Sequence, residues 1–311
     1  MQGVVASLEA FLAPVTALLT PGPAMADAKG VQQPNPVLLL LDPLLTDLPF
    51  EWLPQLQQAT AVVRDFSLHV QNNRATVAAA RQGIAIKQLS YIVDPCLEHT
   101  PQPAPTPTPT APAASKPGSK PVQKGSANNT AVADKASRSL VQAFQQDVLA
   151  VYGKEWTGIT GNASYMPTDT QYDQLLKEAT GFVYCGMCRF VEYVPPAVVL
   201  QADMHSCELA LLLDQAQTAK SLKRQTLHRG ELSNSLISSS GVARMLSMQG
   251  VQSVVVTSLP AAVVSLPEQC SQLLQSLGQG KSVAEAIKPA GKDATGGLVV
   301  YGLLSHKVAS K

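Results

Sequence analysis

The sequence predicts an α/β fold with a mostly parallel central sheet that is flanked by helices. Two short and largely apolar runs, 36–43 and 208–215, are typical of strands that helices cover on both faces. Segments with helical spacing alternate with such runs along the chain, and this alternation favours a parallel sheet. An apolar content of 45% over 311 residues is ample for a sizeable core.

The first part of the chain predicts strands and helices in alternation. Apolar side chains between Gly3 and Leu19 recur on one face of a helix. Prolines bound the strand Pro36–Pro43, and a tight apolar corner, Leu48–Pro54, follows it. The other expected elements of this part are a strand at Thr60–Phe66, a helix at Asn72–Gln82 and a strand at Ile84–Val93 that Asp94 and Pro95 end.

The N-terminal apolar run lacks the pattern of a targeting or membrane-spanning segment. Residues 24–28 loosely match a signal-peptidase site, but no Lys or Arg precedes the run, and Glu9 and Pro14 interrupt it. No run reaches the ~18 apolar residues that a transmembrane helix needs. We therefore expect no membrane partner. The buried, reduced thiols that the cysteine pattern indicates predict a cytoplasmic location.

Composition changes sharply between Thr100 and Val132. Pro-Thr and Pro-Ala repeats give way to Ser, Lys, Gly and Asn. Because almost nothing apolar can be buried here, the segment cannot offset its ordering entropy and predicts a polyproline-like, disordered insert. We expect 1–99 and 136–311 to be two halves of one domain, with 100–135 as the insert. A docking site for a proline-recognising domain is the alternative interpretation of the insert.

The second part of the chain again alternates helices with strands. Expected helices are Ser139–Tyr152, Thr168–Ala179, Leu236–Gln249, Leu266–Leu277 and Val283–Lys288, and a short apolar run lies at Ala197–Leu200. Expected strands are Trp156–Gly161, Gly181–Met187, Glu208–Gln215, Gln252–Leu259 and Leu298–Leu304. The strand that begins at Gly181 ends on a glycine turn, and the carboxyl end of such a strand is where chemistry normally sits in an α/β protein.

Charge argues against a nucleic-acid partner. The formal net charge is +1, so the chain lacks the concentrated positive field that binding through phosphates requires. The basic cluster of Lys220, Lys223 and Arg224 is small, and it indicates a solvated helix surface.

The cysteines indicate buried, reduced thiols. The chain has five, an odd number, without the spacing of a disulfide framework, and Cys185, Cys188 and Cys207 fall in or beside apolar runs. Cys185 and Cys188 have no second Cys or His pair at metal-ligand spacing, so we expect no metal. The usual glycine-rich nucleotide and dinucleotide motifs are absent, so we expect no cofactor.

The order of several short motifs resembles that of CHAT domains, the caspase-like domains that often follow tetratricopeptide repeats. The apolar strand and Leu-Pro-Phe-Glu-Trp-Leu-Pro corner within Leu38–Pro54 are similar to the opening of that family, and Ile86–Pro95 is similar to its third strand. Trp156–Gly161 resembles the Trp-x-Gly-x-x-Gly segment of separase, a related caspase-like protease. Gly241–Val256 and Gly280–Ala286 are similar to a helix–strand unit and the closing helix of CHAT domains. The resemblance implies a three-layer caspase-like sandwich.

The resemblance also implies that this chain has lost its catalytic pair. In the family a histidine base follows one strand and a cysteine nucleophile follows the next long strand. Met187 occupies the histidine position in Gly186-Met187-Cys188, and a thioether cannot accept and return a proton near neutral pH. Ala216 occupies the cysteine position after the strand that contains Leu211–Leu213. The chain is therefore predicted to be a pseudo-peptidase without catalytic residues.

Other reactive groups leave alternatives open. Cys207 or Cys188 could act as a displaced nucleophile, and Met204-His205-Ser206-Cys207 could be aligned with the cysteine motif. We favour the first alignment because Leu211–Leu213 matches the long central strand better. Cys270 lies in a helical pattern that predicts a core position.

Two carboxylates, Asp42 and Asp214, follow apolar strands. Both are expected to accept backbone hydrogen bonds at the strand ends, with a paired acid–base role as the alternative.

The predicted function is a structural or protein-interaction module in a larger assembly, with Thr100–Val132 as a flexible arm. The resemblance implies partners built from helical repeats of the tetratricopeptide type. The Ala-, Gln- and Pro-rich composition suggests a large scaffold, such as that of the ciliary axoneme, as the setting. An active cysteine peptidase and a proline-motif adaptor are the two alternatives.

Overall fold

The computed structural model of the whole chain describes nine stretches of residues: 2–13, 36–57, 59–81, 83–97, 139–162, 165–214, 238–258, 265–287 and 297–303. Several predicted features lie outside them. These are the insert at 100–135, Ala216, and the basic cluster of Lys220, Lys223 and Arg224.

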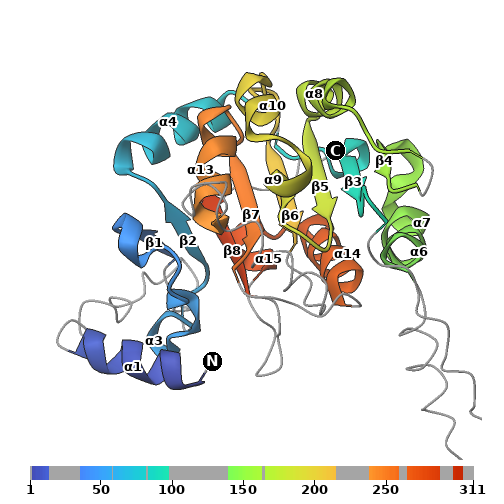
Figure 1. Cartoon of the computed structure of the whole chain (residues 1–311). Helices are drawn as coiled ribbons and strands as arrows, with labels where there is room; N and C mark the ends of the chain where they lie inside the picture. The colour runs from blue at the N-terminus through green and yellow to red at the C-terminus, as the bar shows by residue number, and fades with distance from the viewer. Residues whose placement is uncertain are drawn as a thin grey trace, which may run out of the picture.

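The described strands form one 8-stranded sheet in the order β1-β2-β8-β7-β6-β5-β3-β4 (Figure 1). Strands β1, β2 and β8 are parallel to one another, and so are β7, β6, β5, β3 and β4, while β7 and β8 pair antiparallel. This confirms the predicted α/β class with a mostly parallel sheet. The strands are β1 Val37–Leu40, β2 Val62–Asp65, β3 Ser90–Val93, β4 Thr157–Thr160, β5 Gly181–Cys185, β6 Leu209–Leu213, β7 Ser253–Thr257 and β8 Leu298–Gly302.

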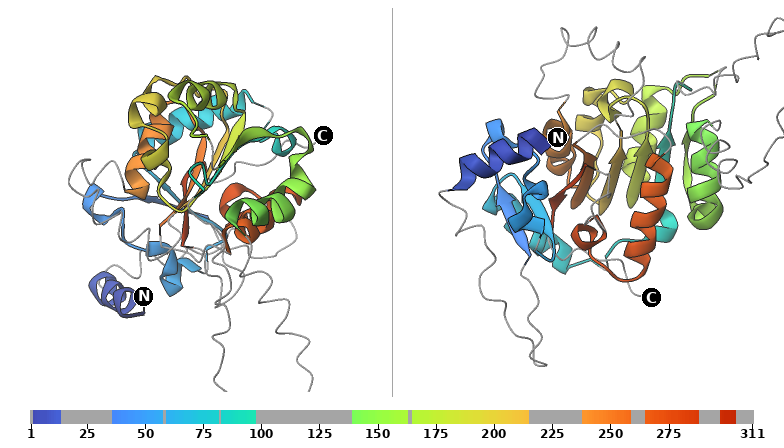
Figure 2. Two further views of the ribbon diagram at one scale, coloured as in Figure 1. Left: turned by 45° about the vertical axis from the view of Figure 1, so that its right-hand side comes forward. Right: turned by 90° about the horizontal axis from the view of Figure 1, so that it is seen from below.

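Helices cover both faces of the sheet (Figure 2). One layer contains α4 Leu68–Ala79, α8 Asp169–Glu178, α9 Phe190–Tyr193, α10 Pro196–Gln201 and α13 Ser239–Met248. The opposite layer contains α6 Leu140–Phe144, the π-helical turn η5 Gln145–Leu149, α7 Ala150–Tyr152, α14 Ser265–Gly278 and α15 Val283–Ala286.

Strand side chains alternate between the two layers. In β6, for example, Leu211 packs in the core under α14, whereas Leu212 packs in the core under α13. Because both faces are covered, β5, β6 and β7 are buried along their whole length, as the apolar runs predicted.

Serine and threonine side chains fix the starts of several helices. Ser67 accepts a hydrogen bond from the backbone N–H of Val70 at the start of α4, and Ser238 does the same for Gly241 at the start of α13. Thr168 forms a capping box with Gln171, which confirms the predicted start of α8.

The prediction that Pro36–Pro43 forms a central strand is wrong. Strand β1 lies at the edge of the sheet, and Leu40 is 41% exposed. The run is apolar for a different reason, since Leu39 packs in a separate small cluster with Leu8 of α1, Gln2–Leu12, and with Phe50 of the following corner. An edge strand that is covered on one face therefore has the composition of a central one.

Smaller differences from the predicted elements lie at element ends. Helix α4 begins at Leu68, four residues before the predicted start at Asn72, because Ser67 caps it. The predicted strand Ile84–Val93 begins with a 3-10 turn, η4 Ile86–Gln88, so that β3 is only its second half. The apolar run Ala197–Leu200 lies within helix α10.

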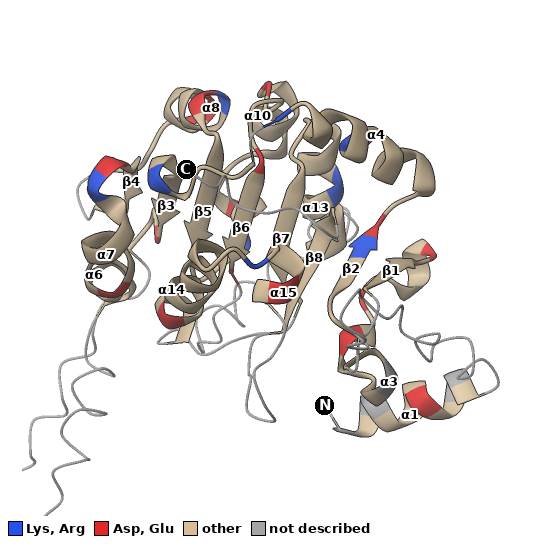
Figure 3. Cartoon of the chain, turned by 180° about the vertical axis from the view of Figure 1, so that it is seen from behind, with Lys and Arg blue, Asp and Glu red and all other residues tan. Residues whose placement is uncertain are grey.

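A buried arginine joins the corner after β1 to β2. The corner contains the 3-10 turns η2 Pro43–Leu45 and η3 Phe50–Trp52, and then α3 Pro54–Gln57. Arg64 of β2 is 2% exposed and forms a two-pronged salt bridge with Glu51, with both N–O distances at 2.6 Å. The same guanidinium donates to the carbonyl oxygens of Thr46 and Leu48. Figure 3 shows β2, the strand that contains Arg64, with Lys and Arg in blue. Arg64 holds the Leu-Pro-Phe-Glu-Trp-Leu-Pro corner against the sheet.

Candidate functional site

The parallel group of strands brings several loop starts together at one edge of the sheet. Val93 of β3 lies opposite Cys185 of β5, and Cys185 lies opposite Leu213 of β6, so the three strands end level. Backbone bonds continue one residue further, from Asp94 N–H to the Cys185 carbonyl at 2.8 Å and from Gly186 N–H to the Leu213 carbonyl at 3.1 Å. This carboxyl edge is where an α/β enzyme would place its reactive groups.

The turn Gly186-Met187-Cys188 follows β5 at this edge. The Tyr184 hydroxyl donates a hydrogen bond of 2.8 Å to the Cys188 carbonyl, which closes the turn. The same hydroxyl leaves no room for a side chain at Gly186, because a Cβ there would lie 2.3 Å from it. The glycine of the turn is therefore required by packing.

Met187 stands in this turn at the position that the resemblance assigns to a histidine base. Its side chain is 1% exposed and belongs to the core cluster that includes Val93, Cys185 and Leu213. A buried thioether neither takes up nor releases a proton near neutral pH, so Met187 supplies packing at this point. The second assigned position, Ala216, lies outside the described residues.

The two cysteines of the turn are poor nucleophiles in this environment. Burial raises the pKa of the Cys185 thiol well above its ordinary value, and burial raises the pKa of the Cys188 thiol to about 12. The thiolate is the reactive form of cysteine, so neither thiol is activated at neutral pH. Cys270 is buried in α14, as its helical pattern predicted, and burial raises its pKa as well.

Cys207 and His205 lie at the other ends of the parallel strands, opposite the carboxyl edge. Both residues precede β6, and the Cys207 thiol is fully buried and donates to the Leu209 carbonyl at 3.6 Å. Burial raises the pKa of Cys207 to about 12. The His205 side chain is 76% exposed, and its Nε2 lies 4.0 Å from a carboxylate oxygen of Asp203. Cys207 therefore precedes the strand that contains Leu211–Leu213, whereas the favoured alignment places the cysteine motif after that strand.

A buried polar network links the strand ends at the carboxyl edge, and residue types alone did not indicate it. Asp214, directly after β6, accepts a hydrogen bond of 3.4 Å from the Phe190 N–H, as expected for a carboxylate at a strand end. The Arg189 guanidinium donates to the Ser239 hydroxyl at 2.6 Å, and Ser239 donates to the Thr257 carbonyl at 2.7 Å. The network joins the turn after β5 to the starts of α9 and α13 and to the end of β7.

Asp214 is the titratable group of this network. Burial raises its pKa to about 6, although the nearby positive charge of Arg189 acts in the opposite direction. Its second carboxylate oxygen, Oδ1, is buried and has no hydrogen-bond partner among the described residues.

The other predicted strand-end carboxylate, Asp42, accepts a 2.9 Å hydrogen bond from the Leu44 N–H at an exposed position, as expected. The two carboxylates follow different strands, β1 and β6, at distant positions in the strand order, so the structure does not pair them.

The described stretches contain neither a metal-binding cluster nor a membrane-spanning helix. No group of three or more His, Cys, Asp or Glu side chains there could hold a metal ion. None of the helices in the same stretches is long and apolar enough to cross a membrane.

Solved structures define the class of the fold. Two crystal structures of the Saccharomyces cerevisiae separase–securin complex superpose on this chain with TM-scores of 0.54 and 0.52, at 13% and 12% sequence identity. They cover 86% and 88% of this chain, which spans 15% and 16% of the separase chains. The chain therefore has the caspase-like α/β fold of separase. No family model matches the sequence.

Similarity in sequence to a curated protein covers part of this chain. Residues of this chain are 32% identical over 143 positions to cilia- and flagella-associated protein 46 of Chlamydomonas reinhardtii. The match covers 42% of this chain and 5% of that protein, so the chain spans a small part of the length of this relative.

Proposed function

We propose that this chain is a non-catalytic caspase-like domain that serves as a structural and protein-interaction module in a ciliary assembly. The observation that carries the proposal is the buried Met187 in the turn after β5. A catalytic base must be able to exchange a proton with the nucleophile, and this thioether is enclosed by core residues.

The state of the thiols supports the same proposal. Four of the five cysteines are buried, and Cys96 alone is partly exposed. Burial raises the pKa of Cys188, the last residue of the turn, to about 12. The two described histidines, His69 and His205, lie in or beside elements at the other edge of the sheet and cannot serve this thiol as a base.

The comparisons support a ciliary setting and a protein-binding role. Similarity to a cilia- and flagella-associated protein supports a ciliary location, with the axoneme as its scaffold. The solved separase structures contain a protein partner, securin, which supports a protein-binding role for this fold. Helical-repeat subunits of the tetratricopeptide type are the partners that we propose for this chain, with neither nucleic acid nor membrane as a partner.

Labelling with a thiol-directed peptidase probe tests the absence of catalysis. The native chain is incubated with a peptidyl acyloxymethyl ketone, and labelled protein is detected by intact mass. We expect this probe to label the native chain no faster than general thiol reagents label a Cys96→Ser variant. Labelling that is fast in the wild type and lost in Cys188→Ser or Cys207→Ser would instead establish an active cysteine peptidase of the CHAT or separase type.

A further inference from the structure

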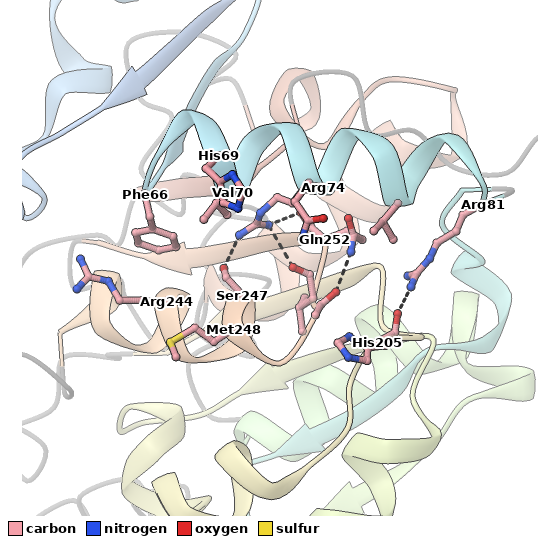
Figure 4. A pocket seen from close by; sticks show the side chains of 14 residues that line it. Phe66, His69, Val70, Arg74, Arg81, His205, Arg244, Ser247, Met248 and Gln252 are labelled. Atoms are coloured by element: carbon pink, nitrogen blue, oxygen red, sulfur yellow. Dashed lines mark hydrogen bonds between the residues drawn. The ribbon is translucent and has the colours of Figure 1, made fainter.

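A basic groove lies between α4 and α13, away from the carboxyl edge described above. Its volume is about 590 Å³, and 14 residues line it (Figure 4). They come from α4 and the residues that flank it, from α13, and from the loops that precede β6 and β7. We call it the α4–α13 groove.

Positive charge is concentrated in this groove. Its basic side chains are His69, Arg74, Arg81, His205 and Arg244, and none of its lining residues is Asp or Glu. The whole chain is nearly balanced, with 23 Lys and Arg against 22 Asp and Glu, so the concentration is local. The nearby carboxylates lie outside the lining: Asp65 is paired with Arg74 at 3.5 Å, and the exposed Asp203 lies beside His205.

Arg74 is a structural part of the groove. It is 4% exposed and donates to the carbonyl oxygens of Val251 and Gln252 and to the Ser247 hydroxyl. It thereby fixes α4 to α13 and to the start of β7, so the two walls keep a constant separation. Its hydrogen-bonding capacity is largely used within the chain.

Two other arginines retain donors for a ligand. Arg81 donates one hydrogen bond to the His205 carbonyl, and no described carboxylate pairs with its guanidinium. The guanidinium of Arg244 lies 5.3 Å above the Phe66 ring, and no described carboxylate pairs with it. A carboxylate is the group that a guanidinium pairs with best, and these two have no such partner among the described residues.

The positions of these two arginines limit the size of the ligand. Figure 4 shows Arg244 at one end of the groove and Arg81 at the other, with α4 running between them. Helix α4 has 12 residues and is therefore ~18 Å long. An extended peptide of roughly five or six residues spans that distance, whereas a single phosphate or carboxylate group does not.

Apolar side chains lie between the two charged ends. Val70 and Val77 of α4 and Met248 of α13 line the groove, and Met248 is 69% exposed. We propose that the α4–α13 groove binds an extended acidic segment of a partner protein, with carboxylates on Arg244 and Arg81 and an apolar side chain between them. This gives the proposed interaction module a partner chemistry, but it does not depend on the absence of catalysis.

Selection of peptides on the full chain tests this inference. A phage-displayed library of random hexapeptides is selected on immobilised wild-type protein, and the enriched peptides are synthesised and titrated by calorimetry. We expect enriched sequences to carry Asp or Glu near both ends with an apolar residue between. Arg244→Met and Arg81→Met should each weaken the binding of these peptides about tenfold or more. Lys177→Met, which removes an exposed cation from α8, should leave it unchanged.

Several results of the peptide selection and the titrations would contradict the proposal. The absence of enriched peptides, enrichment of peptides without Asp or Glu, or unchanged affinity in both arginine variants would overturn the proposal. Displacement of the peptides by inorganic phosphate or by an oligouridylate at a lower concentration than by free acidic peptide would also overturn it. The melting temperature of each variant is measured by circular dichroism. A value equal to that of the wild type shows that lost binding results from the changed groove and not from unfolding. The thiol-probe result is independent, so each proposal can fail alone.

Discussion

The hydroxyl of Tyr184 and the carbonyl of Cys188 are joined by a 2.8 Å hydrogen bond inside the protein. Tyr184 is the fourth residue of β5, and Cys188 is the last residue of the turn that follows this strand. The bond therefore fixes Met187 in the core and keeps the Cys188 thiol buried. A tyrosine within the strand thus determines the shape of the turn at the candidate site.

Tyr184→Phe is expected to destabilise the protein by on the order of 1–3 kcal/mol, because the buried Cys188 carbonyl loses its donor. Urea unfolding of the variant and the wild type measures the difference. Tyr152→Phe provides the matched control, since Tyr152 is partly exposed and no described residue bonds its hydroxyl; its cost should be within about 0.5 kcal/mol. Equal stability of Tyr184→Phe and Tyr152→Phe would show that the bond does not hold the turn.

Gly161→Ala is expected to be among the most disruptive small substitutions in the chain. A Cβ at this position would lie 1.8 Å from the Asp94 carbonyl oxygen, which belongs to the backbone after β3 and cannot move aside. We expect a loss of about 3 kcal/mol or more, the upper range for overpacking. Gly278→Ala in α14 is the control, because nothing lies within 4 Å of its added Cβ, and helix propensity favours the alanine. Thermal unfolding of both variants gives the comparison, and a mild loss for Gly161→Ala would contradict the close approach.

Gly158 and Gly161 show what a sequence motif could and could not predict. Gly158 and Gly161 within Trp156–Gly161 were recognised only through a resemblance to separase. In the structure both lie against β3, where a Cβ at Gly158 would be 2.2 Å from the Tyr91 carbonyl. Close backbone contacts between neighbouring strands leave small residues in the sequence, so a motif of glycines was detectable although its cause was not.

Strand order and the groove could not be predicted in the same way. The apolar pattern of β1 is set by what covers one of its faces, and it contains no information on whether a second strand pairs beyond it. The basic residues of the groove come from positions as far apart in the sequence as His69 and Arg244. Within its own segment, each has the pattern of an ordinary solvated side chain. Their convergence depends on the packing of α4 against α13, which periodicity does not specify.

Arg64→Met is expected to destabilise the protein by about 3–5 kcal/mol, since it leaves the Glu51 carboxylate without its partner in a largely buried position. Glu51→Gln, which keeps the shape of the side chain, should cost less. Lys177→Met is the matched control on the surface: its pair with Asp173 is exposed and should contribute less than about 0.5 kcal/mol. Chemical unfolding of the three variants orders these costs. If Arg64→Met lost no more than Lys177→Met, the corner would not depend on this ion pair.

Asp214→Asn is expected to change how stability depends on pH. Burial raises the pKa of Asp214 from 3.8 to about 6, so between these values the folded chain binds more protons than the unfolded chain. Stability from this group is therefore complete below about pH 4 and is lost as the pH rises through about 6. Asparagine does not titrate, so the free energy of unfolding of the wild type relative to the variant should fall by on the order of 2–3 kcal/mol between about pH 4 and about pH 7.5. Urea unfolding at both pH values measures this difference, and a difference that stays constant would place the pKa of Asp214 near its ordinary value.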